Sequence, residues 1–362
     1  MESGVPGRFL GRRTLSGCPK QARAAIERTT DRPGAPWTGR ESRGLRYAHC
    51  VPSNPPTRKA PPSHGLRFVT AVIVVLAVAG YAAYHFTDLN PGGATCTVKA
   101  EGDELSLDPE QASNAATIAA VATSRGLPER AVTIALATSL QESRLRDLDH
   151  GDRDSLGLFQ QRPSQGWGTA AQILDPVYSS NEFFDSLVKI KGYSRLPLTV
   201  AAQRVQKSGY PQAYAKHEAD ATLLSAALTG RENGALNCTT GGDTPDSAGG
   251  KLGDTSKVTA RLTREFGSQV RPRADAAPRT VAVPSAPAGG AAEGDGTRRG
   301  WELAQWAVAH AHDLKVEQVS FGSMRWQAAQ SGKGWQKQPS GSKGDSATAG
   351  RQDTFVRITV AR

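Results

Sequence analysis

Cysteine is scarce in this sequence, with four among 362 residues, and no two of them form a C-x-x-C pair. None lies in a cluster with histidine either. Structural zinc sites are built from closely spaced Cys and His ligands, so we expect no zinc site. We also expect no other metal and no cofactor.

Methionine is scarcer still, because Met1 is followed only by Met324. The range 1–67 lacks sustained apolar periodicity and is rich in Pro, Gly and Arg, which is typical of a disordered segment. It holds thirteen Lys or Arg against four Asp or Glu, and so carries nine of the ten net positive charges of the chain. A translation start near Arg67, at a residue other than Met, would remove nothing that we expect to fold.

Residues 68–86, FVTAVIVVLAVAGYAAYHF, lack every charged residue type. At about 1.5 Å per residue they match the roughly 30 Å core of a bilayer. We therefore predict one transmembrane helix, with the basic 1–67 tail in the cytoplasm and the bulk of the chain outside. The positive charge is then a signal of topology, and we expect no binding of nucleic acid. The alternative is a signal peptide cleaved near Ala77-Val78-Ala79, which would give a secreted protein.

The cysteines fall on two sides of this predicted span. Cys18 and Cys50 precede it, whereas Cys96 and Cys238 follow it and bracket one segment. An oxidising compartment permits a disulfide between Cys96 and Cys238, which on the chain-entropy model would stabilise the fold by up to about 5 kcal/mol. Two unpaired thiols are the alternative.

Apolar residues recur with helical spacing between Cys96 and Cys238. Caps, prolines and glycines delimit five expected helices, which run from Pro109 to Gly126, from Pro128 to Leu140, from Asp175, from Thr199, and from Pro211 to Gly230. We found no convincing alternating strands here. The range 96–238 is therefore expected to be an all-α, and hence mainly helical, domain.

The remainder is expected to form a linker and a small second module. Residues 239–299 are rich in Gly, Pro and Ala, with one short amphipathic piece near 258–266. In 300–362 a helix precedes two strand-like runs, VEQVSF and FVRITVA, which is typical of a small α+β module. His310 and His312 lie two apart on that helix and point in different directions, so they make a poor metal pair.

One carboxylate stands out, because Glu142 follows the nearly pure apolar run from Ala131 to Leu140. We expect its carboxyl to meet a partly apolar wall. Desolvation of this kind raises the pKa of a carboxylic acid and keeps a proton available near neutral pH. A general acid for glycoside cleavage needs this property.

The surrounding sequence resembles that of a known family. Glu142-Ser143, followed after a loop by Gly157-Leu158-Phe159-Gln160, is similar to the Glu-Ser and Gly-Leu-Met-Gln motifs of lysozyme-like lytic transglycosylases and goose-type lysozymes. The resemblance covers about residues 107–230 and suggests a membrane-anchored cell-wall protein of the actinobacterial type. It implies a lysozyme-like domain that cleaves peptidoglycan between N-acetylmuramic acid and N-acetylglucosamine.

The resemblance also implies roles for the matched residues. Glu142 protonates the glycosidic oxygen, and in a transglycosylase it then acts as the base that lets the 6-hydroxyl of the sugar close an anhydro ring. Ser143 supports Glu142 or the substrate acetamido group. Gln160 hydrogen-bonds the glycan, and Gly157 and Phe159 belong to the same wall of the cleft, with Phe159 in the Met place.

Two aromatic residues complete the expected glycan cleft. Trp167, between two glycines, offers a face for a sugar ring, with a packed loop anchor as the alternative. The Ala-Tyr-Asn motif of transglycosylases is absent, and the comparable place reads QKSGYPQAYAKHE. Tyr210 or Tyr214 is available there as the tyrosine, and we predict that Tyr210 contacts substrate. No Asn accompanies either, which puts the transglycosylase outcome in question.

The loop after Glu142 is crowded with charge. Its aspartates are Asp147, Asp149, Asp152 and Asp154. One of them would hold the attacking water if the enzyme is a hydrolase. Ca²⁺ binding is a weaker alternative, because the Gly at position six and the Glu at position twelve of an EF-hand are missing. Three arginines, Arg144, Arg146 and Arg153, favour an internally paired, solvated loop.

These observations favour a membrane-anchored extracytoplasmic enzyme acting on peptidoglycan glycan strands, either a lytic transglycosylase or a muramidase. The alternative is a non-catalytic wall-binding or scaffold protein that keeps the cleft. In either case the module at 300–362 is available to contact wall polymer or a wall-associated protein partner. A nucleic-acid binder would have to act through 1–67.

Overall fold

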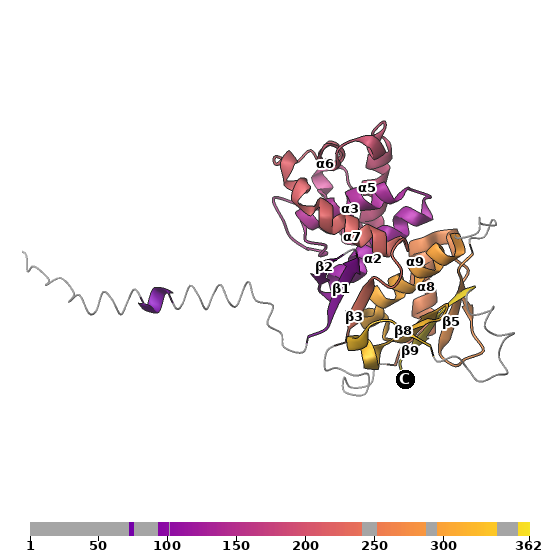
Figure 1. Ribbon diagram of the computed structural model, residues 1–362. Coiled ribbons are helices and arrows are strands. Elements are labelled where there is room, and N and C mark those ends of the chain that lie inside the picture. The colour runs from indigo at the N-terminus through magenta and orange to yellow at the C-terminus, as the bar shows by residue number, and fades with distance from the viewer. Residues whose placement is uncertain (1–71, 76–92, 101, 241–251, 287–294, 339–353) are drawn as a thin grey trace, which may run out of the picture. The chain divides into compact units, whose positions relative to one another are not determined.

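A computed structural model describes residues 72–75, 93–100, 102–240, 252–286, 295–338 and 354–362. Every element below belongs to one compact unit, Gly80–Arg362. Its elements up to residue 240 are β1 (Thr95–Ala100), β2 (Asp103–Leu107), α2 (Pro109–Ser124), α3 (Glu129–Glu142), η2 (Pro163–Gln165), α4 (Ala170–Ile173), α5 (Pro176–Val188), η3 (Tyr193–Arg195), α6 (Leu198–Gln206), η4 (Pro211–His217), α7 (Glu218–Leu228) and β3 (Leu236–Thr239) (Figure 1). Those after it are α8 (Thr255–Phe266), η5 (Gly267–Gln269), β4 (Arg273–Ala274), β5 (Thr280–Pro284), α9 (Asp295–Ala309), α10 (Ala311–Leu314), β6 (Val316–Phe321), β7 (Met324–Gln327), η6 (Ala328–Lys333), β8 (Gln336–Lys337) and β9 (Phe355–Val360).

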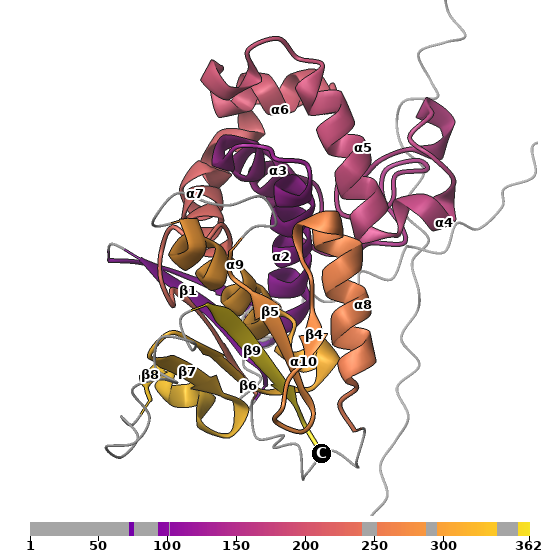
Figure 2. The ribbon, with the colours of Figure 1, turned by 90° about the vertical axis from the view of Figure 1, so that its right-hand side faces the viewer.

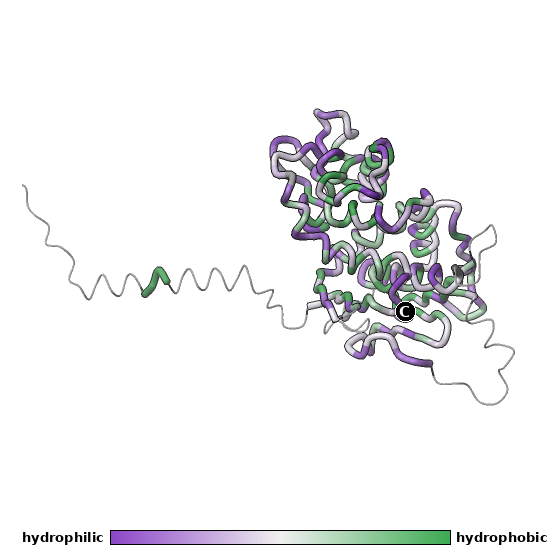
Figure 3. The backbone as a smooth tube through the Cα atoms, turned by 45° about the horizontal axis from the view of Figure 1, so that its top comes forward, coloured by the Kyte–Doolittle hydropathy of each residue, from purple (hydrophilic) through white to green (hydrophobic). Residues whose placement is uncertain are grey.

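Helices α2 and α3 form the centre of the first part. Pro109 stands at the first turn of α2, where its missing N–H costs nothing, and every α2 residue from Ala112 to Ala122 is buried. Both helices are apolar on nearly every face, so each needs neighbours all round. Helices α3, α5, α7, α8 and α9 supply them by packing against α2. Hydrophobic stretches accordingly lie in these central helices, while the connecting loops are mostly hydrophilic (Figure 3).

Four of the five helices expected from the sequence are present, one of them with a shifted start. The fifth, expected to begin at Pro211, is divided into the 3-10 segment η4 (Pro211–His217) and α7, which starts at Glu218. Helix α5 begins as predicted, with Asp175 Oδ1 accepting a hydrogen bond from the Val177 N–H at 3.0 Å. Helix α6 begins at Leu198 after Pro197, so Thr199 lies inside the helix instead of capping it.

The expected mainly α fold is nevertheless wrong, because the protein contains two β-sheets. Strands β2-β1-β3 form an antiparallel three-stranded sheet beside the helices, and β4-β5-β9-β6-β7-β8 form a six-stranded one. The first sheet pairs Cys96 on β1 directly with Cys238 on β3. These strands were not predicted because β1 and β3 are short and lie far apart in the sequence. The sequence near each strand therefore contains no sign of the strand with which it pairs.

The Cys96–Cys238 disulfide is present, as predicted. It closes a loop of 142 residues that contains every element from β2 to α7. Replacing both cysteines by serine is expected to lower the free energy of unfolding by about 2–5 kcal/mol. Chemical denaturation with and without reductant measures this. Cys18→Ser with Cys50→Ser is the matched control, and an equal loss of stability in that control would contradict a specific role of the disulfide.

The C-terminal elements do not form a separate module. The α9 residue Gln305, fully buried, accepts a hydrogen bond from the Leu236 N–H at 2.8 Å and donates to the carbonyl of Ala227 at 2.7 Å. Trp326 and Trp335 add hydrogen bonds to Asn237 Oδ1 and the Leu236 carbonyl. Helix α9 thus lies between α2 and the six-stranded sheet (Figure 2). The expected helical domain and small α+β module are one packed unit, in which β4, β5 and α8 come from the supposed linker.

A buried polar cluster reinforces this junction. Glu265 at the end of α8 is 2% exposed and accepts hydrogen bonds from Trp306 Nε1 at 2.6 Å, Arg261 Nε at 2.8 Å and Thr117 Oγ1 at 3.0 Å. His310 Nε2 lies 3.4 Å from the same carboxylate, and His310 Nδ1 lies 2.8 Å from Ser113 Oγ. Burial of a carboxylate costs several kcal/mol unless its oxygens find such donors. The cluster therefore ties α8 and α9 to α2.

The predicted single membrane-spanning helix is also not part of the described fold. Among the residues with assigned structure, no helix is both long and apolar enough to cross a bilayer. Of the predicted range 68–86, only residues 72–75 are described, as one helical turn. The remainder of that range and the basic tail 1–67 lie outside the described residues.

Candidate active site around Glu142

Glu142 is the last residue of α3, and the residues before it from Ala131 to Leu140 are all buried. Glu142 itself is half-buried at the end of this apolar helix. Burial raises the pKa of Glu142, while hydrogen bonds from Tyr214 and Gln206 act in the opposite direction. The raised pKa favours a protonated carboxyl, which is the form that a general acid requires.

Tyr214 is the closest described partner of this carboxyl. It lies in η4, is fully buried, and donates its phenolic O–H to Glu142 Oε1 at 2.8 Å. Burial, together with the nearby Glu142 carboxyl, raises the pKa of Tyr214, so the phenol stays protonated and acts as a donor. Tyr214, not the predicted Tyr210, is therefore the tyrosine that the fold brings to Glu142. The sequence contained both, and only the packing of η4 against α3 distinguishes them.

The Gly-Leu-Phe-Gln motif forms a tight turn against the end of α3. Leu156 and Gln161 close the turn through two backbone hydrogen bonds of 2.9 Å. Gly157 has a φ of +70°, and a Cβ there would lie 2.6 Å from the Ile173 carbonyl oxygen. Position 157 therefore requires glycine, for its backbone and for its close contact with α4.

Ser143 holds this turn in place. Its hydroxyl donates to the Leu158 carbonyl at 2.8 Å, and Ser139 one turn earlier donates to the same oxygen at 3.0 Å. Ser143 is only 6% exposed. Ser143 was predicted to support either Glu142 or the substrate acetamido group. Its hydroxyl contacts the turn beside Glu142, which fits the first of these roles.

Phe159 and Gln206 fix the turn from the other side. Phe159 is fully buried and stacks on Phe183 with ring centroids 4.6 Å apart. Its carbonyl accepts a hydrogen bond from Gln206 Nε2 at 2.7 Å. Since Gln206 also acts on the Glu142 carboxyl, it links the turn to the acid. Gln206 belongs to no recognised motif, so it was not identified as a site residue from the sequence.

The other predicted cleft residues, Gln160, Trp167 and Tyr210, make their described contacts with groups other than Glu142. Gln160 has a φ of +48°, and its amide donates to the Gly157 carbonyl at 3.3 Å within its own loop. Trp167 is half-buried and packs against the core, as its alternative reading predicted. Tyr210 is 80% exposed, and its backbone N–H donates to Ser208 Oγ at 3.1 Å, so its ring is open to solvent.

The acidic loop divides into paired and unpaired residues. Asp154 accepts hydrogen bonds from the Ser164 N–H at 2.8 Å and from Arg162 Nε at 2.7 Å, which lower its pKa. Exposed Asp149 pairs with His150 at 2.7 Å. Asp147 differs, because burial together with Glu110 and Asp175 raises its pKa to about 6. The acids that act on Asp147 are thus Glu110 and Asp175, and Glu142 is not one of them.

Comparison with known proteins bears on a different part of the chain. A family model described as VldE, C-terminal domain, matches residues 279–349. That range begins just before β5 and includes α9, α10 and β6–β8, whereas Glu142 and its neighbours lie outside it. None of the curated proteins matches the chain.

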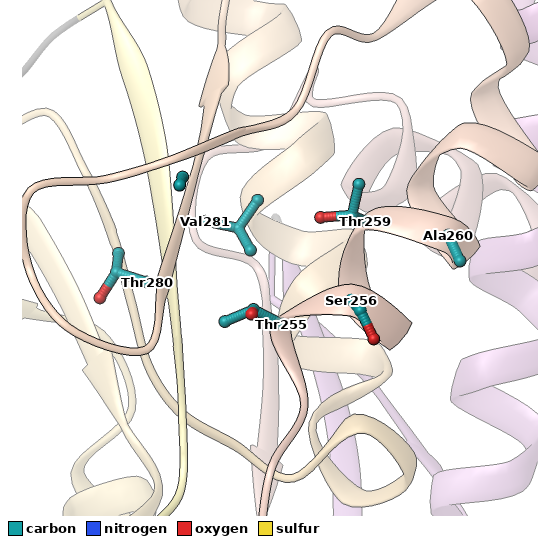
Figure 4. Close-up of a pocket in the computed structure, with 7 residues that line it drawn as sticks. Thr255, Ser256, Thr259, Ala260, Thr280 and Val281 are labelled. Atoms are coloured by element: carbon teal, nitrogen blue, oxygen red, sulfur yellow. The ribbon is translucent and has the colours of Figure 1, made fainter.

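Three cavities lie near α8, and none of them is lined by Glu142. One of about 330 Å³ lies between α8 and the β4–β5 hairpin, and its lining carries hydroxyls of Thr255, Ser256 and Thr259 but no titratable side chain (Figure 4). Another, about 500 Å³, includes Arg261 and Arg264. These arginines already pair with Glu265 and Asp175. The third, about 360 Å³, includes Asp254, which caps α8 through Ser256, and Asp313, which contacts Arg261 and His312. The acids that line these cavities are thus already paired, so Glu142 is the stronger candidate for chemistry.

Tyr214→Phe tests the coupling between the phenol and the acid. The substitution keeps the ring and removes a hydrogen bond that stabilises the ionised carboxylate, so the pKa of Glu142 should rise further. The alkaline limb of a pH–rate profile should then move to higher pH, while the maximal rate falls because the carboxyl is less well held. Tyr210→Phe is the matched control, and a limb that stays in place in the Tyr214 variant would contradict the coupling.

Proposed function

We propose that the protein is an extracytoplasmic enzyme that cleaves peptidoglycan glycan strands between N-acetylmuramic acid and N-acetylglucosamine by general acid/base chemistry. The observation that carries this proposal is the arrangement at Glu142: a half-buried carboxyl with a raised pKa, held by Tyr214 beside the Gly-Leu-Phe-Gln turn. The motif resemblance supplies the substrate class. The disulfide supports an oxidising compartment outside the cytoplasm.

In this proposal the protonated Glu142 donates its proton to the glycosidic oxygen as the bond to the sugar breaks. The Tyr214 hydroxyl then stabilises the carboxylate that remains, because a hydrogen bond to the charged form is stronger than one to the neutral form. The turn that contains Phe159 forms the opposite wall. Its position is fixed by Ser143 and Gln206, which both bond to carbonyls of the turn.

The second step depends on which nucleophile is available. The 6-hydroxyl of the sugar gives an anhydro product, whereas a water held by a second carboxylate gives a reducing end. Asp154 pairs with Arg162 and Asp149 with His150, Asp147 lies near Glu110 and Asp175, and exposed Asp152 has no ion pair with any residue that the structure describes. None of these four aspartates acts on the pKa of Glu142, which favours the transglycosylase route, in which Glu142 acts alone as acid and then as base.

Mass analysis of the fragments released from purified peptidoglycan tests the proposal. We expect soluble muropeptides with a mass lower by one water than the hydrolytic products. Products with the full hydrolytic mass would indicate a muramidase and overturn the transglycosylase step. If folded protein releases no fragments at all, the enzymatic proposal fails.

A non-catalytic wall-binding protein is the second candidate. The absence of the Ala-Tyr-Asn motif and the return of the Gln160 amide into its own loop favour it. It predicts sedimentation of the protein with insoluble peptidoglycan, no released fragments, and the same affinity for the wall after Glu142→Ala.

A further inference from the structure

The six-stranded sheet has two faces of different chemistry. Side chains alternate along each strand, so cross-strand partners share a face. One face is apolar, and its neighbouring residues Val281, Ile358, Val319 and Trp326 form a register row that is buried. Phe321 on this face meets Trp301 of α9 with ring centroids 5.8 Å apart. This is the face that α9 covers.

The opposite face carries a row of arginines. The register aligns Arg273 on β4 with Ala282 on β5, Ala282 with Arg357 on β9, Arg357 with Ser320 on β6, and Ser320 with Arg325 on β7. Ala282 and Ser320 are 4% and 9% exposed. Arginines on every second strand therefore flank these small residues, and their long aliphatic stems are able to cover them.

We infer that this arginine row binds a linear polyol-phosphate polymer of the cell wall. Neighbouring strands lie about 4.8 Å apart, so successive arginines stand roughly 10 Å apart and the row spans roughly 20 Å. One small anion is too short to engage all three. A chain with a phosphate in every repeat is able to do so, and the planar guanidinium group suits phosphate oxygens.

The charges of the row remain largely available. Arg273 lies over the Phe355 ring, 4.2 Å from its centroid, which orders the guanidinium without neutralising it. Arg357 donates to Asp275 Oδ2 at 3.1 Å. Arg325 has no ion pair with any residue that the structure describes. Three arginines thus face one carboxylate, a net of two positive charges.

The neighbouring register row supplies groups for polyol hydroxyls. Thr280, Thr359, Gln318 and Gln327 follow one another across the strands on the same face. The Gln327 amide donates to Gln318 Oε1 at 3.2 Å, and the two threonine hydroxyls lie 2.9 Å apart. Thr280 is 5% exposed and also donates to the Pro278 carbonyl, whereas the partly exposed Thr359, Gln318 and Gln327 leave further donors and acceptors for a ligand.

The composition of the face favours a polyol phosphate over a nucleic acid. Single-stranded nucleic acid is held by aromatic side chains on which bases stack. The aromatic residue of this face within the described strands is Phe355, whose ring Arg273 already covers. The choice of a wall polymer rests on the proposed extracytoplasmic function, and it would place Glu142 near its substrate by anchoring the enzyme to the wall.

Binding of the full chain to synthetic poly(glycerol phosphate) tests the inference. Replacing Arg273, Arg325 and Arg357 together by Gln should weaken binding at least tenfold. Binding by the wild type should also fall as salt is raised. The control removes three exposed cations from the helical part by Lys191→Gln, Arg195→Gln and Arg204→Gln, and should leave the affinity unchanged. Thermal unfolding of both variants checks that the sheet is intact.

The result that would overturn the inference is equal binding by the arginine variant and the control, or no binding by the wild type. Tighter binding to single-stranded RNA than to poly(glycerol phosphate) would also overturn it. The arginine variant should still release fragments from peptidoglycan stripped of phosphate polymers. A loss of that release in Glu142 variants alone therefore separates the two proposals, because each depends on a different part of the chain.

Discussion

Glu142→Gln is expected to reduce the release of muropeptides by at least a hundredfold. Glutamine fills the same space and is able to accept the Tyr214 hydrogen bond, but it has no proton to donate to the glycosidic oxygen. General acid–base catalysis contributes about a hundredfold to ten-thousandfold to such reactions. Because the same residue is proposed to act as both acid and base, the loss should lie toward the upper end of that range.

Glu129→Gln is the matched control at the other end of the same helix. Glu129 is partly exposed and forms ion pairs with Arg231 and Arg298, both at 3.1 Å. Both arginines are open to solvent, and pairs of this kind stabilise a protein by about 1 kcal/mol each, so the control should fold and keep its activity. An equal loss of activity in both variants would indicate damage to α3 instead of removal of the acid.

The pH dependence follows from the raised pKa of Glu142. The acid must be protonated at the start of the reaction, so kcat/KM should fall as the pH rises through this pKa. Stability follows the same group: a carboxyl whose pKa is raised by folding destabilises the native state above its unfolded pKa. Glu142→Gln should therefore unfold at a higher temperature than the wild type at neutral pH, and this difference should disappear near pH 4.

Local sequence signals predicted the helices well because each helix carries its own start and stop. Pro109, Asp175 and the glycines after α2 and α7 act through backbone geometry within a few residues, and the structure shows them at helix ends. Glu142 was likewise chosen as the candidate acid from local sequence, since the apolar run before it already predicted partial burial of its side chain. Strands VEQVSF and FVRITVA were also found as β6 and β9.

What the sequence did not show depends on contacts between distant segments. The strands β1 and β3 are paired only through residues more than a hundred positions apart, and β5 is a short apolar run within a Pro- and Ala-rich stretch. The choice of Tyr214 over Tyr210, and the part played by Gln206, likewise require knowledge of how η4 and α6 pack. The burial of Gln305 and Glu265 likewise follows from the packing of α8 and α9 against α2.

Glu265→Ala is expected to lower the free energy of unfolding by about 3–5 kcal/mol, the usual cost of removing one partner from a buried ionic cluster. The side chains left without their acceptor are Arg261, Trp306 and Thr117, all facing the junction between α8, α9 and α2. Burial alone would raise the pKa of Glu265, but His310, Arg261 and the Trp306 hydrogen bond hold it at about 2. A depressed pKa contributes stability above the unfolded value of about 4.5, and this contribution is lost as the pH falls toward 2.

Urea denaturation at neutral pH and at pH 3 measures both effects, and the difference between wild type and Glu265→Ala should shrink at the lower pH. Glu317→Gln is the control, because Glu317 pairs with Arg279 on the surface at 3.2 Å and should cost less than about 1 kcal/mol. If Glu265→Ala costs no more than this control, the cluster does not hold the two parts together. Glu265→Ala could also lower the urea concentration at which the helical part unfolds. This result would show that α2, which packs against the Glu142 helix α3, depends on α8 and α9 for its stability.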